Sequence, residues 1–195
     1  MEPTDIELVT LAKAAQDERA FAALVRRHQA RLRAFLVRLC GDASLADDIA
    51  QDAFIKAHAG LSGFKGGGSF RSWLYAIAYR EFLQDARKAK AAARLEGALK
   101  ENAAPEAGAL QTGLSLDLRR ALSQLDEMER AAILLCDAAG FSHTEAASAL
   151  SAPLGSVKTY VARAREKMRA MLSAETSSEP DAPRPQPAKG PHYVV

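Results

Sequence analysis

The side chains best suited to chemistry in this sequence are basic and polar, and many of them gather within residues 156–172. Lys158, Thr159 and Arg163 fall on the opposite side of a predicted helix from Val157 and Val161. Lysine and arginine form hydrogen bonds with guanine edges or phosphates, and threonine contacts a phosphate or a thymine methyl group. The pattern predicts a surface that binds the major groove of DNA. Its candidate contacts are Ser156, Lys158, Thr159, Tyr160, Arg163 and Arg165.

A helix-turn-helix is predicted to position this surface. Ser142 and Glu145 form an S-x-x-E capping pattern at the start of the segment HTEAASAL. The turn SAPLG follows, and we expect Ser156 to open the basic helix. In such a motif the second helix enters the major groove. An ordinary helical hairpin with a solvated basic face is the alternative.

A second group of basic and aromatic residues follows the glycine-rich loop at 60–69. Ser69 is expected to cap a helix on which Trp73 faces the core, while Tyr75 and Tyr79 fall off the apolar stripe. Exposed rings beside positive charge suit single-stranded DNA, because bases stack on the rings while phosphates are neutralised. The alternative is that Trp73 simply packs the core, and for Trp73, Phe70 and Ile77 the spacing favours it. The candidate contacts are Phe64, Lys65, Ser69, Arg71, Tyr75, Tyr79, Arg80, Arg87 and Lys88.

An acidic helix is predicted between these features and the N-terminus. Gly41 should end the preceding helix, and Ser44 is a plausible N-cap for this one, with Asp47 three residues later. Asp48, Gln51, Asp52 and Ile55 share one side of it. A polar face with one apolar residue suits a protein interface, although a solvated face is the default.

No catalytic, metal-binding or cofactor-binding pattern is visible. The four histidines share no metal-ligand spacing, and no nucleophile–base or phosphate-loop motif occurs. Cys40 and Cys136 lie far apart in the sequence, which favours plain core residues in a reducing cytoplasm. No apolar run approaches the roughly 20 residues that cross a bilayer, so no membrane insertion is expected.

Composition and charge indicate an all-α protein with two contacts to a polyanion. The 195 residues carry a net charge of +2, but residues 41–54 sum to −4, residues 65–94 to +5 and residues 156–172 to +4. The helical stripes predict one domain over 1–94, a linker over 95–113, a second domain over 114–172 and a disordered proline-rich tail over 173–195. Asp126 with Glu129 should cap a helix in the second domain.

Three segments together resemble the extracytoplasmic-function (group IV) sigma factors of bacterial RNA polymerase. ADDIAQDAF (46–54) resembles the D-x-x-Q-[DE]-x-F signature of sigma region two, and FRSWLYAIAYREFLQDARK (70–88) resembles the F-R-x-W-L-[YF]-x-I-A helix. GFSHTEAASALSAPLGSVKTYVARAREKMR (140–169) resembles the region-four pattern. The three motifs occur in the family's order, across a linker.

The resemblance implies roles that the composition alone does not supply. Residues Asp48, Gln51, Asp52, Phe54 and Ile55 would bind core RNA polymerase, at the β′ clamp helices beside the β subunit. The loop near 64–69 and the helix 70–88 would recognise the −10 element and hold its opened non-template strand. The helix 156–169 would recognise the −35 element as duplex. An anti-sigma factor commonly covers these surfaces.

Two other functions remain open at this point. A stand-alone helix-turn-helix regulator would need no polymerase-binding helix at 44–56. A helical interaction protein without DNA contact would show no salt-dependent DNA affinity.

Overall fold

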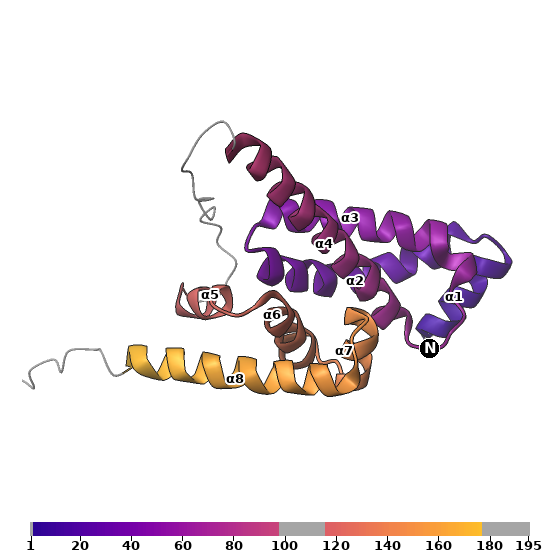
Figure 1. The fold of residues 1–195 in the computed structure, drawn as a ribbon. Helices are drawn as coiled ribbons and strands as arrows, with labels where there is room; N and C mark the ends of the chain where they lie inside the picture. The colour runs from indigo at the N-terminus through magenta and orange to yellow at the C-terminus, as the bar shows by residue number, and fades with distance from the viewer. Residues whose placement is uncertain (1, 98–115, 177–195) are drawn as a thin grey trace, which may run out of the picture.

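The computed structural model describes residues 2–97 and 116–176, and every regular element within these ranges is helical (Figure 1). The prediction of an all-α chain is confirmed. Among the described helices, none is both long enough and apolar enough to cross a bilayer. The elements are α1 (Asp5–Ala14), α2 (Glu18–Cys40), α3 (Ala43–Gly60), the 3-10 turn η1 (Leu61–Gly63), α4 (Phe70–Gly97), α5 (Leu116–Ser123), α6 (Glu127–Ile133), the π-helical segment η2 (Leu134–Ala138), α7 (His143–Leu150) and α8 (Leu154–Thr176).

The N-terminal half is built on the long amphipathic helix α2. Asp17 caps its first turn by accepting a hydrogen bond from Arg19 N at 2.8 Å, and Gly41 ends it in the left-handed conformation, with φ of +75°. Helices α1, α3 and α4 all pack on it. Its apolar stripe is fully buried at Leu24, Leu32 and Leu36, and each such leucine contributes about 1.5–3 kcal/mol through burial.

Helix α1 and two helix starts differ from the sequence-based expectation. Thr4 and Glu7 form a capping box at α1, which was not predicted as a helix. Asp42, rather than Ser44, caps α3, because its carboxylate accepts from the backbone N–H of residues 44 and 45 at 2.7 and 3.1 Å. The basic helix α8 begins at Leu154, two residues before Ser156.

The C-terminal half packs α5, α6 and α7 along one side of α8. The predicted capping boxes are present at α6, between Asp126 and Glu129, and at α7, between Ser142 and Glu145. Glu129 is only 2% exposed, and its carboxylate accepts a hydrogen bond from Lys167 of α8 at 2.6 Å. That ion pair, between a buried carboxylate and a partly exposed lysine, joins the start of α6 to α8.

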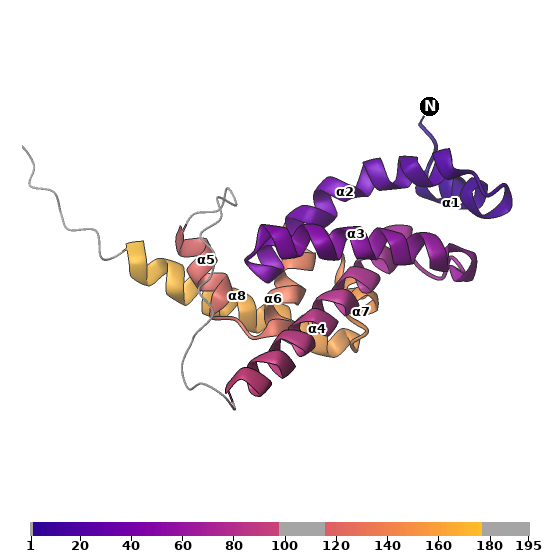
Figure 2. The ribbon, with the colours of Figure 1, turned by 90° about the horizontal axis from the view of Figure 1, so that it is seen from above.

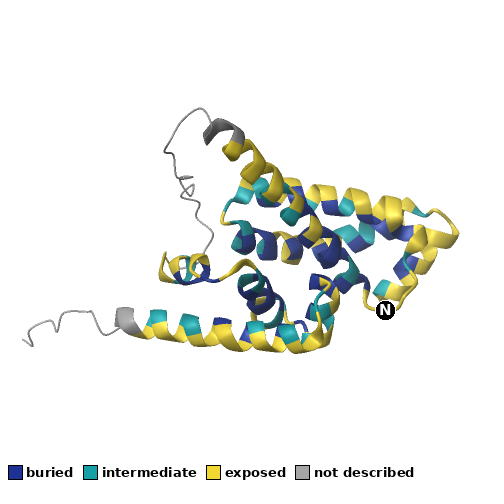
Figure 3. Ribbon diagram, in the orientation of Figure 1, coloured by how far each residue is buried: buried dark blue, intermediate teal, exposed yellow. Residues whose placement is uncertain are grey.

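The two halves lie against each other, as two perpendicular views show (Figures 1 and 2). Helix α4 runs beside α7, and α2 lies beside η2. Buried residues of both halves face this junction (Figure 3). We call the junction the seam and define it by Arg71, Tyr75 and Tyr79 on α4 and by Met128 and Phe141 in the C-terminal half.

The domain boundaries remain a prediction. Residues 95–97 of the proposed linker belong to the end of α4, and its residues 98–113 lie outside the described ranges. Helix α8 continues to Thr176, into the segment predicted as a tail, whose residues 177–195 also lie outside them. Cys40 is partly buried, and burial raises the pKa of its thiol to about 12, which disfavours the thiolate.

Candidate nucleic-acid and partner interfaces

The helix-turn-helix presents α8 with one side buried and the other open. Ser142 Oγ accepts from Glu145 N at 3.2 Å, and Ser142 N donates to the Glu145 carboxylate at 2.9 Å. The chain then turns at Ser151, with φ of +51°, before α8 begins. Val157 and Val161 are at most 1% exposed and fix the rotation of α8. The basic side of the helix must therefore face outward.

Four of the six predicted duplex contacts are exposed on this side, namely Lys158, Thr159, Arg163 and Arg165. Arg165 is already engaged, because its Nε and Nη2 donate to the two carboxylate oxygens of Asp137 at 3.0 and 2.6 Å. The hydrogen bond from Arg165 lowers the pKa of Asp137. Lys158 and Arg163 thus form the more available pair for a nucleic acid.

The remaining two predicted duplex contacts are less accessible. Ser156 is half-buried in the first turn of α8. Tyr160 is half-buried and packs against the core, not in the open with Lys158. A position three residues after the buried Val157 lies at the border of the helix's apolar face, which explains why its ring turns inward.

The expectation that Tyr75 and Tyr79 are exposed is wrong. Tyr75 is 1% exposed, with its ring centroid 5.2 Å from that of Phe35 and 4.9 Å from that of Phe141. Burial raises the pKa of Tyr75 to about 12. The ring is thus held between one aromatic residue of each half of the chain.

Tyr79 is covered by the first turns of α6. It is 3% exposed, and its hydroxyl donates to Met128 Sδ at 3.1 Å and lies 3.5 Å from a carboxylate oxygen of Glu127. Burial, assisted by the negative charge of Glu127, raises the pKa of Tyr79. The hydroxyl of Tyr79 therefore donates its hydrogen bond to the other half of the chain and not to a solvent-borne ligand.

Arg71 is also occupied by the C-terminal half. Its guanidinium carbon lies 4.0 Å from the centre of the Phe141 ring, a cation–π geometry. It also donates to the carbonyls of Ala139 and Gly140 and to the carboxylate of Glu145, at 3.3–3.4 Å. Three of the predicted single-strand contacts therefore lie in the seam.

The other predicted single-strand contacts remain outside the seam. Phe64 is half-buried and packs its ring 5.0 Å from that of Trp73. Ser69 caps α4, as predicted, by accepting from Ser72 N at 3.1 Å. Lys88 pairs with Asp85 across one helical turn at 3.3 Å. Those exposed to solvent are Lys65, Ser69, Arg80, Arg87 and Lys88.

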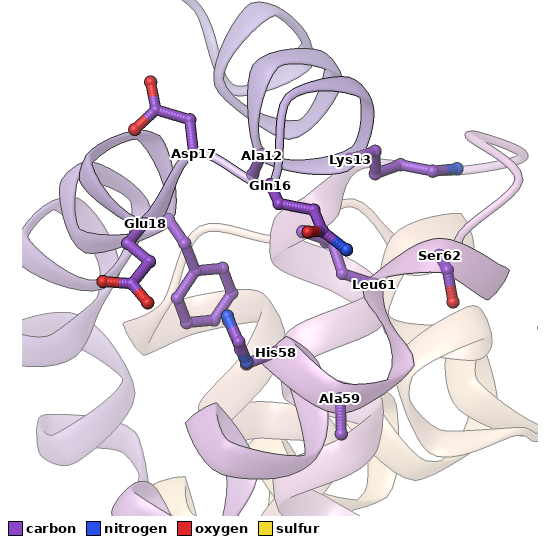
Figure 4. A pocket seen from close by; sticks show the side chains of 10 residues that line it. Ala12, Lys13, Gln16, Asp17, Glu18, His58, Ala59, Leu61 and Ser62 are labelled. Atoms are coloured by element: carbon purple, nitrogen blue, oxygen red, sulfur yellow. The ribbon is translucent and has the colours of Figure 1, made fainter.

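A cavity lies beside Leu61 and Ser62, where the glycine-rich loop begins (Figure 4). It holds about 470 Å³ between the end of α1, the start of α2 and the end of α3. On one side of it, Lys13 of α1 reaches out and donates to the carbonyl of Phe64 at 2.8 Å. On another side, the rings of His58 and Phe21 pack in a T-shaped arrangement, with 4.7 Å between their centroids. Helix α1 therefore supports the loop that precedes α4.

The acidic helix α3 exposes its predicted interface residues beside an apolar groove. Asp48, Gln51, Asp52 and Ile55 are exposed, and Phe54 is half-buried. The groove between α2 and α3 measures about 550 Å³, and its walls include Val25, Ala30, Ala50, Phe54 and Ile55. Ile55 is 57% exposed, a large apolar side chain available to a partner.

An ion pair lies in the wall of this groove. Arg33 of α2 donates to both carboxylate oxygens of Asp47 at 2.5 and 3.0 Å. This hydrogen bonding lowers the pKa of Asp47. The pair links α2 to α3 beside the groove, and the groove is present in the chain without a partner.

The residues that the sequence-based reasoning missed are Met128 and Phe141, which cover the α4 face. Phe141 directly precedes the N-cap Ser142, a position where an apolar residue commonly packs against the first turns of its own helix, so no sequence signal indicated its contact with α4. In the described residues no group of three His, Cys, Asp or Glu side chains is placed to hold a metal ion.

Comparisons with known proteins agree with this arrangement. The family model "Sigma-70 region 2" matches residues 24–92, and "Sigma-70, region 4" matches residues 115–168. The RNA polymerase sigma-H factor of Pseudomonas aeruginosa is 34% identical over 163 residues, spanning 77% of this chain and 84% of that protein. The ECF RNA polymerase sigma factor SigM of Mycobacterium tuberculosis H37Rv is 36% identical over 173 residues, spanning 88% and 86%.

Two solved structures share the fold. Sigma factor RpoE of Bartonella quintana, in complex with the anti-sigma factor NepR, aligns with a TM-score of 0.68 and 29% identity, over 80% of this chain and 99% of that one. CnrH, in complex with the cytosolic domain of CnrY, aligns with a TM-score of 0.66 and 30% identity, over 88% and 97%.

Proposed function

The chain belongs to the extracytoplasmic-function group of the sigma-70 family, and from that membership we propose how its surfaces share the work of starting transcription. It acts as an alternative sigma factor that binds core RNA polymerase and directs it to promoters. An anti-sigma factor controls it, as NepR and CnrY accompany the two structural relatives. Polymerisation chemistry belongs to the polymerase, so the chain works in the bacterial cytoplasm as an initiation factor without catalytic residues.

Helix α3 docks on the polymerase. The groove offers apolar walls, and Asp48, Gln51 and Asp52 are exposed polar groups on the same helix α3. An apolar centre with a polar rim is the usual anatomy of a protein interface. We assign this surface, with Phe54 and Ile55, to the β′ clamp helices, beside the β subunit.

Helix α8 recognises the −35 element as duplex DNA. Lys158 and Arg163 are exposed, and the helix stands on a buried valine stripe that fixes its direction. An exposed helix of this kind enters the major groove and places its N-terminal residues on base edges. Thr159 and Arg165 add contacts to the phosphates.

Helix α4 and the preceding loop bind the opened −10 strand. Arg80, Arg87 and Lys88 give the exposed side of α4 its positive charge. Tyr75 and Tyr79 are buried in the structure, so the exposed cations of α4 carry the contact with the phosphates of the strand. Capture of the unstacked strand along this charged side would favour the melted promoter.

The observation that carries the proposal is the coexistence, in one fold, of an open partner groove on α3 and an exposed basic helix in a helix-turn-helix. A stand-alone regulator would need only the second. The purified chain should be mixed with sigma-free core polymerase and genomic DNA fragments, and the 5′ ends of the transcripts mapped. Discrete new start sites with shared −10 and −35 sequences are expected.

A double variant of α3 tests polymerase docking separately from DNA binding. Asp48→Arg combined with Gln51→Ala should abolish core binding while leaving the fold intact, because both side chains are exposed. The matched control is Asp117→Arg with Gln124→Ala, the same chemical changes at exposed positions of the C-terminal half. Transcription retained by the α3 variant would contradict the docking assignment. If a chain still binds core polymerase but gives no DNA-dependent transcription starts, the result would point to a different set of promoters.

A further inference from the structure

We propose that a cavity between α2 and η2 binds a small condensed phosphate, such as pyrophosphate or the phosphate chain of a nucleotide. We call it the arginine cavity, after Arg31, Arg38 and Arg71 in its lining. It shares no lining residue with the α2–α3 groove. The inference goes beyond the proposed function, because it adds a soluble phosphorylated ligand that needs neither polymerase nor promoter DNA.

The arginine cavity has the size of a small-molecule site. It holds about 550 Å³, within the roughly 300–1,000 Å³ that is usual for ligand pockets. One wall is the segment from η2 to the start of α7, with residues 134 and 137–140. The opposite wall is one face of α2, which contributes Arg31, Ala34, Phe35 and Arg38.

The lining carries three guanidinium groups and one carboxylate. Arg31 and Arg38 come from α2 and Arg71 from α4, and the carboxylate is that of Asp137. Asp137 is already paired with Arg165, whose Nη2 lies 2.6 Å from one of its oxygens. A cavity that gathers charges of one sign between protein walls raises the local concentration of the opposite ion. An anion is therefore the ligand that this lining favours.

Arg31 and Arg38 also have hydrogen-bond donors to spare. In the described part of the chain, Arg31 makes no hydrogen bond or ion pair, and Arg38 donates to the carbonyl of Ala34 in its own helix at 2.9 Å. A guanidinium carries five N–H donors. Arg33 and Arg165 each bind a carboxylate instead. The two arginines of the cavity therefore differ from those that join helices, and most of their donors are available to a ligand.

The spacing of these two arginines favours an extended anion. They are seven residues apart, which is two turns of α2 and about 10 Å along its axis, so both face the same side. Ala34 lies between them and fills little of the space. A chain of phosphates presents acceptor oxygens along its length, and each guanidinium can donate to it in a bidentate manner. Such a chain matches the separation better than a single compact ion.

Arg71 supplies the third positive charge while it keeps its contact in the seam. Its guanidinium carbon lies 4.0 Å from the centre of the Phe141 ring. Burial raises the pKa of Tyr75, and the charges of Arg71 and Arg31 both oppose that rise. The two cations therefore act on the same neighbourhood although they belong to different helices. A ligand in the cavity meets positive charge from α2 and α4 together.

Calorimetric titration of the full-length chain with sodium pyrophosphate tests the site. The buffer contains no magnesium and is kept at one ionic strength, so that screening stays constant. One pyrophosphate should bind per chain, and adenosine triphosphate should bind with a similar Kd. Succinate should bind about tenfold more weakly or not at all, because it has less charge and fewer acceptor oxygens. Saturating pyrophosphate should also raise the urea midpoint, since it binds the folded chain.

A double variant of α2 locates the bound anion. Arg31→Gln combined with Arg38→Gln should weaken pyrophosphate binding about 100-fold, because each lost charge-assisted hydrogen bond costs about tenfold. Glutamine has nearly the helix propensity of arginine, so the fold should persist. The matched control is Arg19→Gln with Arg26→Gln, which removes the same charge from exposed positions of the same helix. The control should leave the Kd nearly unchanged.

A third variant should act in the opposite direction. Asp137→Asn removes the carboxylate of the lining and should tighten pyrophosphate binding by up to about fivefold, the range of a partly exposed charge interaction. Urea midpoints of all three variants show that each is folded. A Kd that weakens in the asparagine variant would mean that the anion lies elsewhere, and it would overturn the proposal.

Other outcomes decide the remaining alternatives. No binding by the parent chain, or an equal loss in the α2 variant and its control, would overturn the site in favour of general electrostatics. Succinate that binds as tightly as pyrophosphate would overturn the phosphate class. Displacement of pyrophosphate by a short single-stranded oligonucleotide would make these arginines a contact for DNA and overturn the proposal as well.

The titration is independent of the sigma assignment. It contains no polymerase, so a chain that binds pyrophosphate at the arginine cavity but starts no transcription would support the site and lose the proposed function. A chain that starts transcription but binds no pyrophosphate would keep the proposed function and lose the site.

Discussion

Helices α4 and α8 both carry the residue types of a DNA-binding surface, yet one is covered and the other is open. On α8, Lys158 and Arg163 face solvent, whereas on α4 Tyr75 and Tyr79 are at most 3% exposed. Helix α8 buries a single narrow stripe, while α4 is apolar nearly all round its first half. A helix of the second kind needs packing partners on several sides. The comparison shows that the elements packed against a helix, and not its residue types alone, decide whether its basic and aromatic side chains are exposed.

The largest expected effect comes from a change in the buried valine stripe that supports the exposed side of α8. Val161→Asp should destabilise the C-terminal half by about 3–5 kcal/mol, because it buries an unpaired carboxylate where the valine is 1% exposed. Urea unfolding measures the loss. The exposed neighbour supplies the control: Ala162→Asp should cost less than about 1 kcal/mol, mainly through helix propensity. Similar losses in the two variants would mean that α8 does not stand on its valines.

The covered surface should be nearly as sensitive to truncation. Tyr75→Ala removes a ring held between Phe35 and Phe141 and should cost about 3 kcal/mol in unfolding free energy. Tyr75→Phe keeps both ring contacts and should cost about 1 kcal/mol or less. A loss below about 0.5 kcal/mol for the alanine variant is the behaviour of a surface residue, and it would remove the contrast between the two helices.

The open surface should respond in binding and not in stability. Arg163→Ala is expected to weaken binding to a −35-bearing duplex by about 1–3 kcal/mol if the side chain contacts a base edge. Arg165→Ala should weaken it less, because Asp137 already engages that guanidinium. Fluorescence anisotropy on promoters with and without the −35 match measures both. An equal loss on the two promoters would make Arg163 a phosphate contact.

The smallest expected effect is a pH dependence that originates in the N-terminal half. His28 is 6% exposed, its Nε2 lies 2.8 Å from a carboxylate oxygen of Asp5, and its ring lies 5.5 Å from that of Phe70 at the start of α4. Burial lowers the pKa of His28, outweighing the opposite influence of Asp5. As the pH falls, His28 is therefore protonated at a higher pH in the unfolded chain than in the folded one.

The sign of that pH dependence follows from linkage. The stabilising contribution of neutral His28 is fully present above the histidine's unfolded pKa of about 6.5 and is lost as the pH falls through the lower folded value. Urea midpoints, followed by the fluorescence of Trp73 in the same half, should therefore decline below about pH 6.5. His28→Gln should flatten this part of the profile. An unchanged slope in that variant would assign the effect to other groups.

Much of the fold could be predicted because it depends on local chemistry. The capping boxes at Ser142 and Asp126 satisfy backbone N–H groups within one helical turn, and Gly41 supplies a left-handed residue at a helix end. Thr4 and Glu7 carry the same capping signal at the start of α1. Asp42 and Ser44 both suit an N-cap, so the sequence alone could not choose between them.

The candidate site residues fall into the same two groups: those whose exposure follows from local patterns, and those whose burial follows from distant contacts. Exposure on α3 and α8 follows from the apolar stripe of each helix, so Asp48, Gln51 and Lys158 could be placed correctly. Burial of Tyr75 and Tyr79 depends on residues about 50–65 positions away in the sequence, across the linker. Helical periodicity carries no information about a partner at that separation, and the same limit applies to Arg71.

The cover over Arg71 has a consequence for how the protein moves among competing sites on a chromosome. A genome offers roughly 10⁶–10⁹ non-specific sites, and each cation that reaches a phosphate strengthens such binding. With Arg71 held against Phe141 and Glu145, the free molecule presents fewer cations to passing DNA. More copies then remain in solution to meet polymerase, and fewer are lost to random duplex.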